Sequence, residues 1–360
     1  MTTRQRLNLL SRAYPRLFPR RELLRLLEEQ LGQVDALDKW FRRPGSLTWS
    51  QVRAPGLVYH ICAGNLAVSA QMSLGHGLLL GAMNVLKLPG DRDDLSTRRE
   101  ILDFIRGLPA PLRKLVKTER ELDPALLRRA EVVIAFGSDA TMASLRAQTV
   151  PAQKFIAHGH ALSLLWLAEP ERFGSKEARA CAVDVLTYDQ LGCLSPQAIY
   201  APPGARISEI GGKLARALET AWRKMKRKPA RPITVAARIT EARDVAHGLG
   251  HRVWLPPTKH LGWTVIHDPK SAFRPSALHG IIYLRQASPA GLKRALASVA
   301  GKISTVGVAG KMNAASEKTF LDLGVTRFCA AGKMQFPPLT WHHDGRPVLA
   351  ELVTWIDRET

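Results

Sequence analysis

The sequence lacks any long hydrophobic run. Its 360 residues contain no stretch of about 18 uninterrupted apolar residues, and a membrane-spanning helix needs a run of roughly that length. The Arg-rich beginning is not followed by the apolar segment of a secretory signal. We therefore expect no transmembrane segment and a cytoplasmic location.

Cysteine is also scarce. The chain has four cysteines, Cys62, Cys181, Cys193 and Cys329. Their spacing is too wide and irregular for a CxxC zinc or redox pair, and a chain of this length needs no disulfide bonds to hold its core together. We expect four free thiols.

Acidic residues are few relative to basic ones. Asp and Glu number 31 against 52 Lys and Arg, which gives a formal net charge of +21. Such a charge suits nucleic acid, an anionic membrane surface or a polyanionic small molecule. The basic residues are spread over many segments, and the densest run, residues 223–231, is typical of a solvated helix end. A basic nucleic-acid or membrane-surface binding protein stays as an alternative, and its binding would weaken steeply with salt.

The hydrophobic pattern predicts an α/β protein. Leucines at intervals of three and four predict helices within residues 3–40. From about residue 56, β-rich runs such as GLVYHI, NVLKL and EVVIAF alternate with amphipathic helical stretches, and this alternation is typical of a parallel sheet covered by helices on both faces. A second series follows Cys193 and includes QAIYA, ITVAAR and GIIYLR, so we predict a second α/β domain.

Cys193 is the most prominent candidate for chemistry. It lies in YDQLGCLSP, a Gly-preceded loop between a predicted helix and a predicted strand. Such a loop can expose a thiol, and the thiolate is a strong nucleophile. A lone cysteine is more often a small buried hydrophobic residue, so this loop alone does not decide the function.

Three further segments end predicted strands with polar groups. In HICAGN, an amide of Asn65 could donate a hydrogen bond to an oxyanion. An asparagine that only caps a turn or helix would produce the same sequence pattern. Lys87 ends the strand NVLK, and open parallel sheets bind ligands at that edge. Gly137 and Ser138 join a strand to a helix whose first N–H groups could receive a phosphate, but the full GxGxxG pattern is missing and Ser138 could be a plain helix cap.

Taken in order, these motifs resemble the aldehyde dehydrogenase superfamily, and within it the long-chain fatty acyl-CoA reductases of bacterial luminescence. The resemblance covers roughly residues 56–357 and rests on YDQLGCLSP, HICAGN with NVLK, FGSDATMASLR and TWHHDG. It implies two α/β domains, a Rossmann-type cofactor domain and a catalytic cysteine domain. We accordingly divide the chain into an N-terminal helical segment (1–55), a cofactor-binding domain (56–160), a catalytic domain (161–336) and a C-terminal turn with a docking helix (337–360).

The resemblance also implies roles for individual residues. Cys193 matches the nucleophile, Asn65 matches the oxyanion asparagine, and Lys87 with Gly137-Ser138 matches the cofactor-binding strand end and turn. The expected reaction is the reduction of an acyl-CoA, held as a Cys193 thioester, by NAD(P)H to an aldehyde. The acyl group would arrive on CoA or on another acyl carrier. The resemblance also implies an acyl-protein synthetase as a possible partner and a homo-oligomeric assembly.

Two departures from the superfamily pattern sharpen this expectation. Oxidising aldehyde dehydrogenases have a glutamate that activates water, and Ala157 stands at that position here. Transfer to or from CoA is then favoured over hydrolysis, and an ordinary oxidative aldehyde dehydrogenase becomes the alternative, with His158 or His160 as substitutes for the missing base. NAD-preferring members often have a glutamate three residues after the strand-end lysine. This chain has Gly90 there and Arg92 close by, which could pair with a 2′-phosphate, so NADPH is the preferred cofactor and NADH is possible.

Histidine-rich segments raise the question of a metal. Residues 158–160 and 342–344 carry ligands of the right type, but nothing at zinc-site spacing in the sequence completes a tetrahedral set. We predict no metal. His342 or His343 could instead donate a proton to a forming alkoxide, although a polar turn is the simpler reading.

Overall fold

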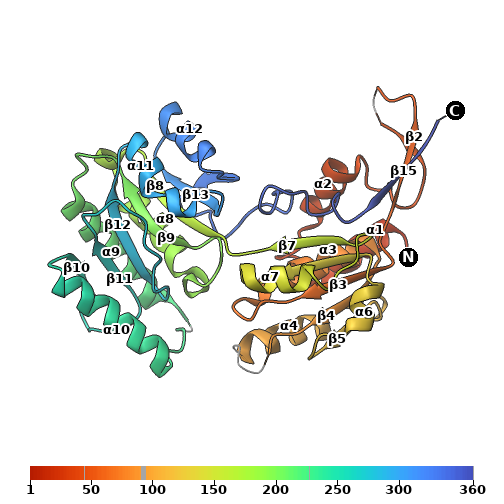
Figure 1. The fold of residues 1–360 in the computed structure, drawn as a ribbon, viewed down its shortest axis with the longest axis horizontal. Helices are drawn as coiled ribbons and strands as arrows, with labels where there is room; N and C mark the ends of the chain where they lie inside the picture. Colours follow the sequence, from red (N-terminus) through yellow and green to blue (C-terminus); the bar gives the residue numbers. More distant parts are fainter. Residues whose placement is uncertain (44, 91–94, 227, 360) are drawn as a thin grey trace. The chain divides into compact units, whose positions relative to one another are not determined.

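The computed structural model describes residues 1–43, 45–90, 95–226 and 228–359, and the chain divides into two compact units (Figure 1). Unit 1 comprises Met1–His160 and Pro338–Thr360, and unit 2 comprises Ala161–Pro337. Arg92, which the sequence proposes as a cofactor contact, lies outside the described residues. No helix formed by the described residues is long and apolar enough to cross a membrane.

Unit 1 is built on a five-stranded parallel sheet. The strands run in the order β5-β4-β3-β6-β7. They are β3 (Leu57–Ile61), β4 (Met83–Lys87), β5 (Val116–Glu119), β6 (Val132–Phe136) and β7 (Lys154–His158). The chain moves outward from β3 to β5 and then returns to the other side of β3, so the order reverses between β3 and β6. Open parallel sheets bind ligands beyond the carboxyl ends of the strands at such a reversal.

Helices cover both faces of this sheet. They are α1 (Thr3–Ala13), α2 (Arg20–Leu31), α3 (Ala67–Leu80), α4 (Leu95–Gly107), α5 (Ala110–Arg113), α6 (Pro124–Arg129) and α7 (Asp139–Arg146). Alternate residues of β3 point to opposite faces: Val58 packs in the core under α1 to α4, whereas Tyr59 and Ile61 pack in the core under α6 and α7. The helices predicted within residues 3–40 are confirmed by α1 and α2, and α1 begins with a capping box at Thr2.

A small antiparallel sheet joins the two ends of unit 1's sequence. Its order is β1-β2-β15, formed by β1 (Phe41–Arg42), β2 (Trp49–Arg53) and β15 (Thr354–Arg358). A helix was expected after the turn at residues 343–345, and that expectation is wrong: the segment forms turns and then β15, which pairs with β2. The pairing partner lies about three hundred residues away, so local periodicity could not reveal it.

Unit 2 has a seven-stranded sheet in the order β10-β11-β12-β9-β8-β13-β14. Only the β10–β11 neighbours are antiparallel among the strand pairs of this sheet that the described residues form. The strands are β8 (Leu162–Leu167), β9 (Pro196–Ala201), β10 (Arg252–Trp254), β11 (Thr264–His267), β12 (Ile281–Gln286), β13 (Ile303–Ala309) and β14 (Arg327–Ala330). The predicted second α/β series is therefore confirmed, with one exception.

The exception is ITVAAR, which was expected as a strand and is the start of helix α10 (Ile233–Gly248). The β-branched residues suggested a strand, but the packed residues Val235, Ile239, Ala242 and Ala246 recur at helical spacing. Pro232 precedes the helix, where a missing N–H does no harm. Tertiary packing of this apolar stripe prevails over the local strand preference.

The other helices of unit 2 also form two layers. They are α8 (Ser175–Leu186), α9 (Ile207–Lys224), α11 (Pro289–Ala295) and α12 (Ala314–Asp322), with short 3-10 turns η1 (Pro170–Arg172), η2 (Thr187–Gln190) and η3 (Ala297–Val299). On β9, Ile199 packs with the α8 and α9 layer, whereas Ala198 and Tyr200 pack with the α11 and α12 layer. This two-sided burial explains why β9 is apolar throughout its length.

Candidate active site

Cys193 lies in the loop that joins η2 to β9, at the amino edge of unit 2's sheet. The residue is half-buried, and its carbonyl oxygen accepts a hydrogen bond from Ser163 Oγ at 2.7 Å. A second loop bond runs from Ser195 N–H to the Gly192 oxygen at 2.9 Å. The backbone on both sides of Cys193 is therefore held in place.

The loop has an unusual backbone just before the cysteine. Tyr188, Asp189 and Gln190 all have positive φ, at 55°, 52° and 63°. Left-handed conformations are unfavourable for residues with a side chain, by roughly 1–2 kcal/mol each, and such strain persists only where the surroundings over-determine it. A second left-handed run, residues 278–280, lies against the first.

Hydrogen bonds lock these two runs together. Asp189 accepts two bonds at 2.8 Å from Arg231 in a fork geometry, and its Oδ2 lies 2.5 Å from Nδ1 of His279. Gln190 is fully buried: its oxygen accepts from Gly280 N–H at 3.0 Å, and its amide donates to the carbonyl oxygens of Pro196 and Ile281. The Arg231 and Asp189 side chains are only 13% and 11% exposed, so solvent screens this ion pair little.

The other three cysteines have poor prospects as nucleophiles. Burial raises the pKa of the Cys62 thiol to about 12 and that of Cys329 to about 11, and it also raises the pKa of Cys181. At neutral pH these thiols are almost entirely protonated, and the thiolate is the reactive form. Because the other three thiols are protonated, Cys193 is favoured as the nucleophile.

In unit 1 the remaining candidates gather at one sheet edge. Lys87 is the last residue of β4 and pairs with Ile61, the last residue of β3, four residues before the exposed Asn65. Ser138 follows β6 on the same carboxyl edge. The sequence-predicted residues of this unit are thus brought to the edge where open parallel sheets bind ligands.

Ser138 does act as a helix cap. Its Oγ accepts a hydrogen bond from Thr141 N–H at 3.1 Å at the start of α7, and Asp139 already occupies the first turn. Asn65 does not cap α3, because Leu66 is the residue at the N-cap. The interpretation of Asn65 as the N-cap of α3 is therefore wrong, and its roles as a turn residue or an oxyanion donor stay predictions.

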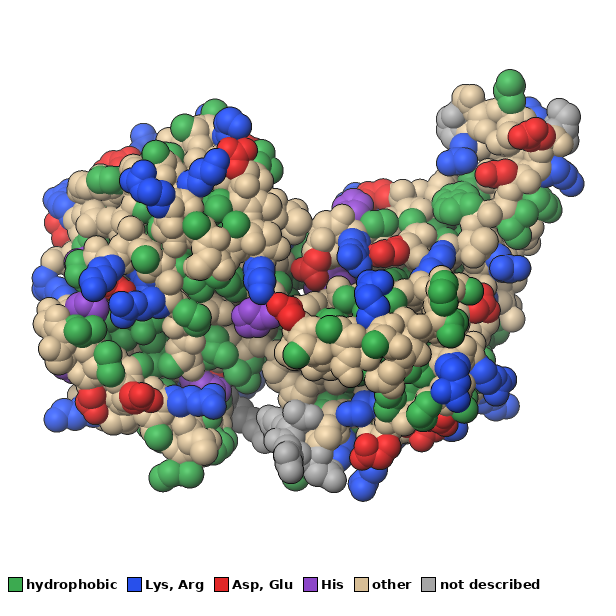
Figure 2. Space-filling model, in the orientation of Figure 1, with side chains coloured by type: hydrophobic (Ala, Val, Ile, Leu, Met, Phe, Trp, Pro, Cys, Tyr) green, Lys and Arg blue, Asp and Glu red, His purple; other side chains and the backbone are tan. Residues whose placement is uncertain are grey.

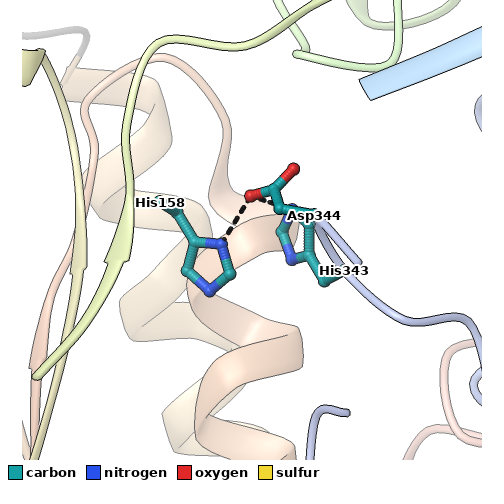
Figure 3. A group of neighbouring side chains, drawn as sticks. All are labelled: His158, His343 and Asp344. Atoms are coloured by element: carbon teal, nitrogen blue, oxygen red, sulfur yellow. Dashed lines mark hydrogen bonds and ion pairs between the residues drawn. The ribbon is translucent and has the colours of Figure 1, made fainter. Parts of the chain in front are cut away.

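The structure also assembles a group that sequence reasoning considered only in pieces. His158 at the end of β7 lies beside His343 and Asp344 from the C-terminal segment (Figure 3). His158 Nδ1 is 2.8 Å from Asp344 Oδ2, and His343 Nε2 is 3.7 Å from the same oxygen. The three side chains each offer a metal-ligand atom within 4.8 Å of the others. Residues 158 and 343–344 were noted separately, but no sequence signal could show that they meet across nearly two hundred residues.

Two more histidines of unit 1 are buried, one on strand β3 and one on helix α3. His60 on β3 is within hydrogen-bond distance of Ser73 Oγ at 2.7 Å and of Asn84 Oδ1 at 3.0 Å. His76 on α3 is buried, and its Nε2 has no hydrogen-bond partner among the described residues. Burial lowers the pKa of His60 to about 4 and that of His76 to about 3, so both are neutral at physiological pH.

Comparison with known proteins now decides the family. The family model described as acyl-CoA reductase (LuxC) matches residues 2–355, nearly the whole chain. The chain belongs to the acyl-CoA reductase (LuxC) family. It is an oxidoreductase of the acyl-CoA reductase type, as the sequence motifs predicted.

Solved structures show that this acyl-CoA reductase has the aldehyde dehydrogenase fold. An aldehyde dehydrogenase of Mycobacterium tuberculosis, complexed with NAD+, matches 100% of the chain and 86% of its own, with a TM-score of 0.69 and 14% identity. Aldehyde dehydrogenase 21 of Physcomitrella patens, in complex with its product succinate, matches 99% and 86%, with a TM-score of 0.65 and 14% identity. An NADP-dependent glyceraldehyde-3-phosphate dehydrogenase of Bacillus halodurans, complexed with NADP, matches 99% and 87%, with a TM-score of 0.69 and 12% identity. No curated protein matches the chain.

Proposed function

We propose that this acyl-CoA reductase forms a thioester between Cys193 and the acyl group, and that NAD(P)H then reduces the thioester to an aldehyde. The observation that carries the proposal is the loop of Cys193, where three consecutive left-handed residues are held by buried hydrogen bonds. Backbone strain of this kind is concentrated at functional sites. Cys193 is the nucleophile, and the other three cysteines, Cys62, Cys181 and Cys329, whose thiol pKa burial raises, are structural.

Unit 1 is proposed as the cofactor unit. The carboxyl edge of its sheet, at the reversal between β3 and β6, suits a dinucleotide, and Lys87 and Ser138 lie at the strand ends that would hold it. A nicotinamide cofactor, when bound, supplies a hydride to the acyl carbon. NADPH is the preferred cofactor because the sequence offers Arg92 as a partner for its 2′-phosphate, and NADH is the alternative.

The residues of the chain have distinct tasks in this proposal. The Cys193 thiolate attacks the acyl carbonyl carbon, the C–S bond to CoA breaks, and the sulfur of CoA leaves with the bonding electrons. Asn65 and the Cys193 backbone N–H donate hydrogen bonds to the oxyanion, and one such donor contributes roughly 3–4 kcal/mol in enzymes where it has been removed. Ala157 offers no carboxylate to activate water, which favours reduction over hydrolysis of the thioester.

The surface charge agrees with small polyanionic ligands. On the face shown in Figure 2, Lys and Arg side chains are scattered with Asp and Glu among them rather than gathered in one stripe. A single basic stripe is the footprint expected of a nucleic-acid binding protein. We accordingly propose CoA and NADPH as the anionic ligands, with an acyl-carrier protein as a second form of the substrate.

The proposal extends to the substrate, the assembly and the location. A long acyl chain and an acyl-protein synthetase partner are proposed from the family resemblance, and a cytoplasmic location is proposed from the sequence alone. A homo-oligomer is proposed as well, because β15 is an edge strand of the β1-β2-β15 sheet and presents the partly exposed Ile356. Unpaired edge strands readily pair with another chain.

The test is intact-mass spectrometry after incubation with acyl-CoAs of several chain lengths, without cofactor. Wild type should gain the mass of one acyl group, Cys193→Ala should gain none, and Cys329→Ala, which removes the other half-buried cysteine, should behave as wild type. Adding NADPH or NADH should then remove the adduct as aldehyde forms, and the faster cofactor identifies the preferred one. If wild type forms no adduct with any chain length, the thioester mechanism is wrong.

A further inference from the structure

The imidazole of His158 is held in a stack of rings that belongs entirely to unit 1. The Phe136 ring has its centroid 4.7 Å away at an interplanar angle of 13°, and the His343 ring lies 4.2 Å away at 23°. Trp341 extends the stack, 4.7 Å from His343. Packing by neighbouring rings fixes the plane of the His158 ring, so its two nitrogens point in set directions.

A carboxylate fixes the proton of that ring. His158 Nδ1 lies 2.8 Å from Asp344 Oδ2 (Figure 3). An ionised carboxylate can only accept hydrogen bonds, so Nδ1 carries the proton and donates to Asp344. In the neutral imidazole the other nitrogen, Nε2, is then an acceptor. Asp344 is held by its own turn, because Asp344 and Gly345 both have positive φ and the Arg346 N–H closes the turn on the His343 oxygen.

The Nε2 atom of His158 is open to a ligand. It lies on the side of the ring away from Asp344 (Figure 3), and among the described residues none hydrogen-bonds to it. The side chain is 12% exposed, and Nε2 is not one of the fully buried polar atoms that lack a partner. A ring that is locked in place and has one open acceptor is suited to recognise a hydrogen-bond donor of a ligand.

The position of His158 in the sheet indicates which part of a dinucleotide it meets. A dinucleotide lies across the reversal of strand order, here between β3 and β6, and its adenosine ribose meets a residue roughly 20 positions after the first strand-to-helix turn. That turn contains Gly64, and Lys87 ends β4 at about this spacing. The nicotinamide half is then left for the other side of the reversal, where β6 and β7 end. His158 is the last residue of β7, and its carbonyl oxygen accepts from the Gly137 N–H at 3.2 Å.

We propose that His158 Nε2 accepts a hydrogen bond from the carboxamide of the nicotinamide ring, and that Asp344 is the positioning residue of His158. The inference rests on the proposed function, in which unit 1 binds the cofactor, and it deepens that function by naming the group that recognises the nicotinamide. A carboxamide N–H2 is a donor, whereas a carboxylate at the same place offers only acceptors. The pair of His158 and Asp344 therefore selects nicotinamide dinucleotides over nicotinic acid dinucleotides.

The ring stack argues against a metal ion as the ligand of this cluster. Two histidines that bind one zinc ion must each aim a ring nitrogen at a point about 2 Å away. The rings of His158 and His343 lie nearly parallel, and His158 Nδ1 already donates to Asp344. An ion would have to break that bond and tilt the rings.

The test measures binding by isothermal titration calorimetry, without an acyl donor. The ligands are NADP+, the same dinucleotide with nicotinic acid in place of nicotinamide, and 2′-phospho-ADP-ribose, which lacks the pyridine ring. If NAD+ binds more tightly than NADP+, then NAD+, its nicotinic acid analogue and ADP-ribose replace them. We expect wild type to bind the nicotinamide form at least about 10-fold more tightly than the nicotinic acid form.

Two variants should lose this preference. In His158→Gln the preference should fall to within a few-fold, because the glutamine amide can rotate to donate or to accept. Asp344→Asn keeps the turn, since Asn tolerates positive φ. It should also reduce the preference to within a few-fold, because an amide no longer fixes the proton on Nδ1.

Controls separate recognition from a structural role. The ligand without the pyridine ring should bind every variant as it binds wild type, because it lacks the group that His158 recognises. His160→Gln removes an exposed histidine two residues away, and His343→Phe keeps the ring stack without its second imidazole; both should keep the wild-type preference.

Three results would overturn the proposal. The first is an unchanged preference in His158→Gln, and the second is an equal loss of affinity for all three ligands in that variant, which indicates a structural role. The third is that wild type binds none of the three ligands, in which case the cofactor role of unit 1 also fails. Thioester formation at Cys193 is tested separately by mass spectrometry without cofactor, so its failure is distinguishable from each of these results.

Discussion

The Arg231–Asp189 pair should control the reactivity of Cys193 more than the stability of the fold. Three left-handed residues store roughly 3–6 kcal/mol of strain at about 1–2 kcal/mol each. Two charge-assisted hydrogen bonds from Arg231 oppose it, each contributing about 1.5–3 kcal/mol. Arg231→Gln removes a stabilisation of the same size as the strain, so the loop should relax while unit 2 stays folded.

The assay has two readouts, acylation of Cys193 by acyl-CoA and alkylation of Cys193 by iodoacetamide. In Arg231→Gln we expect acylation to fall about 100-fold or more, because each 1.36 kcal/mol lost from the free energy that favours the competent loop lowers its population about tenfold, and the two bonds contribute about 3–6 kcal/mol. Alkylation should rise several-fold, because the half-buried thiol becomes more accessible.

A matched control comes from another buried ion pair of the same unit. Arg285 and Asp268 are 0% and 2% exposed with a closest N–O distance of 3.0 Å, and within the described part of the chain no hydrogen bond or ion pair joins Asp268 to the Cys193 loop. Arg285→Gln should lower the melting temperature at least as much as Arg231→Gln, because breaking a buried pair costs about 3–5 kcal/mol. It should leave Cys193 acylation unchanged per folded molecule. Equal effects of the two variants on acylation would refute the idea that the strained loop positions Cys193.

Two further predictions concern unit 1. A buried histidine whose pKa is lower in the folded than in the unfolded protein does not weaken the fold at pH values above its unfolded pKa, where it is neutral in both states. As the pH falls towards the folded pKa, the fold loses stability because only the unfolded state takes up the proton. For His76 this loss occurs between about pH 6.5 and about pH 3. His76→Leu should therefore reduce the loss of melting temperature between pH 7.5 and pH 5, and an unchanged loss would contradict the burial argument. A Cβ on Gly75 would lie 2.2 Å from Phe18 Cζ, so Gly75→Ala should destabilise by about 1–3 kcal/mol in chemical denaturation, whereas Gly212→Ala, with its nearest atom at 3.7 Å, should be neutral or stabilising.

Much of the architecture follows from local sequence. Apolar runs that end in Gly, Asn or Ser predicted β3, β4, β6 and β9 with the residues that follow them, because each run forms a strand buried on both faces. The turn at Asp344-Gly345 was also predictable from the sequence, because few residue pairs accept two positive φ values. Local chemistry of this kind needs no distant partner.

Other elements were decided only by tertiary contacts. Residues 233–248 carry strand-forming residues and still form α10, because their apolar stripe packs on β11 and β12. Residues 354–358 form β15 because β2 supplies its hydrogen bonds. In both segments, contacts with residues distant in the sequence determined whether a helix or a strand formed.

The candidate site shows the same division. The sequence by itself determined which residues are chemically able to act, Cys193, Asn65, Lys87 and Ser138, because their types and neighbouring strands are local facts. Only the tertiary structure brought His158 to Asp344 and Asp189 to Arg231, across separations of 186 and 42 residues. Side-chain pairs at such separations depend on how sheets and turns are placed in space, and that information is not contained in any single segment.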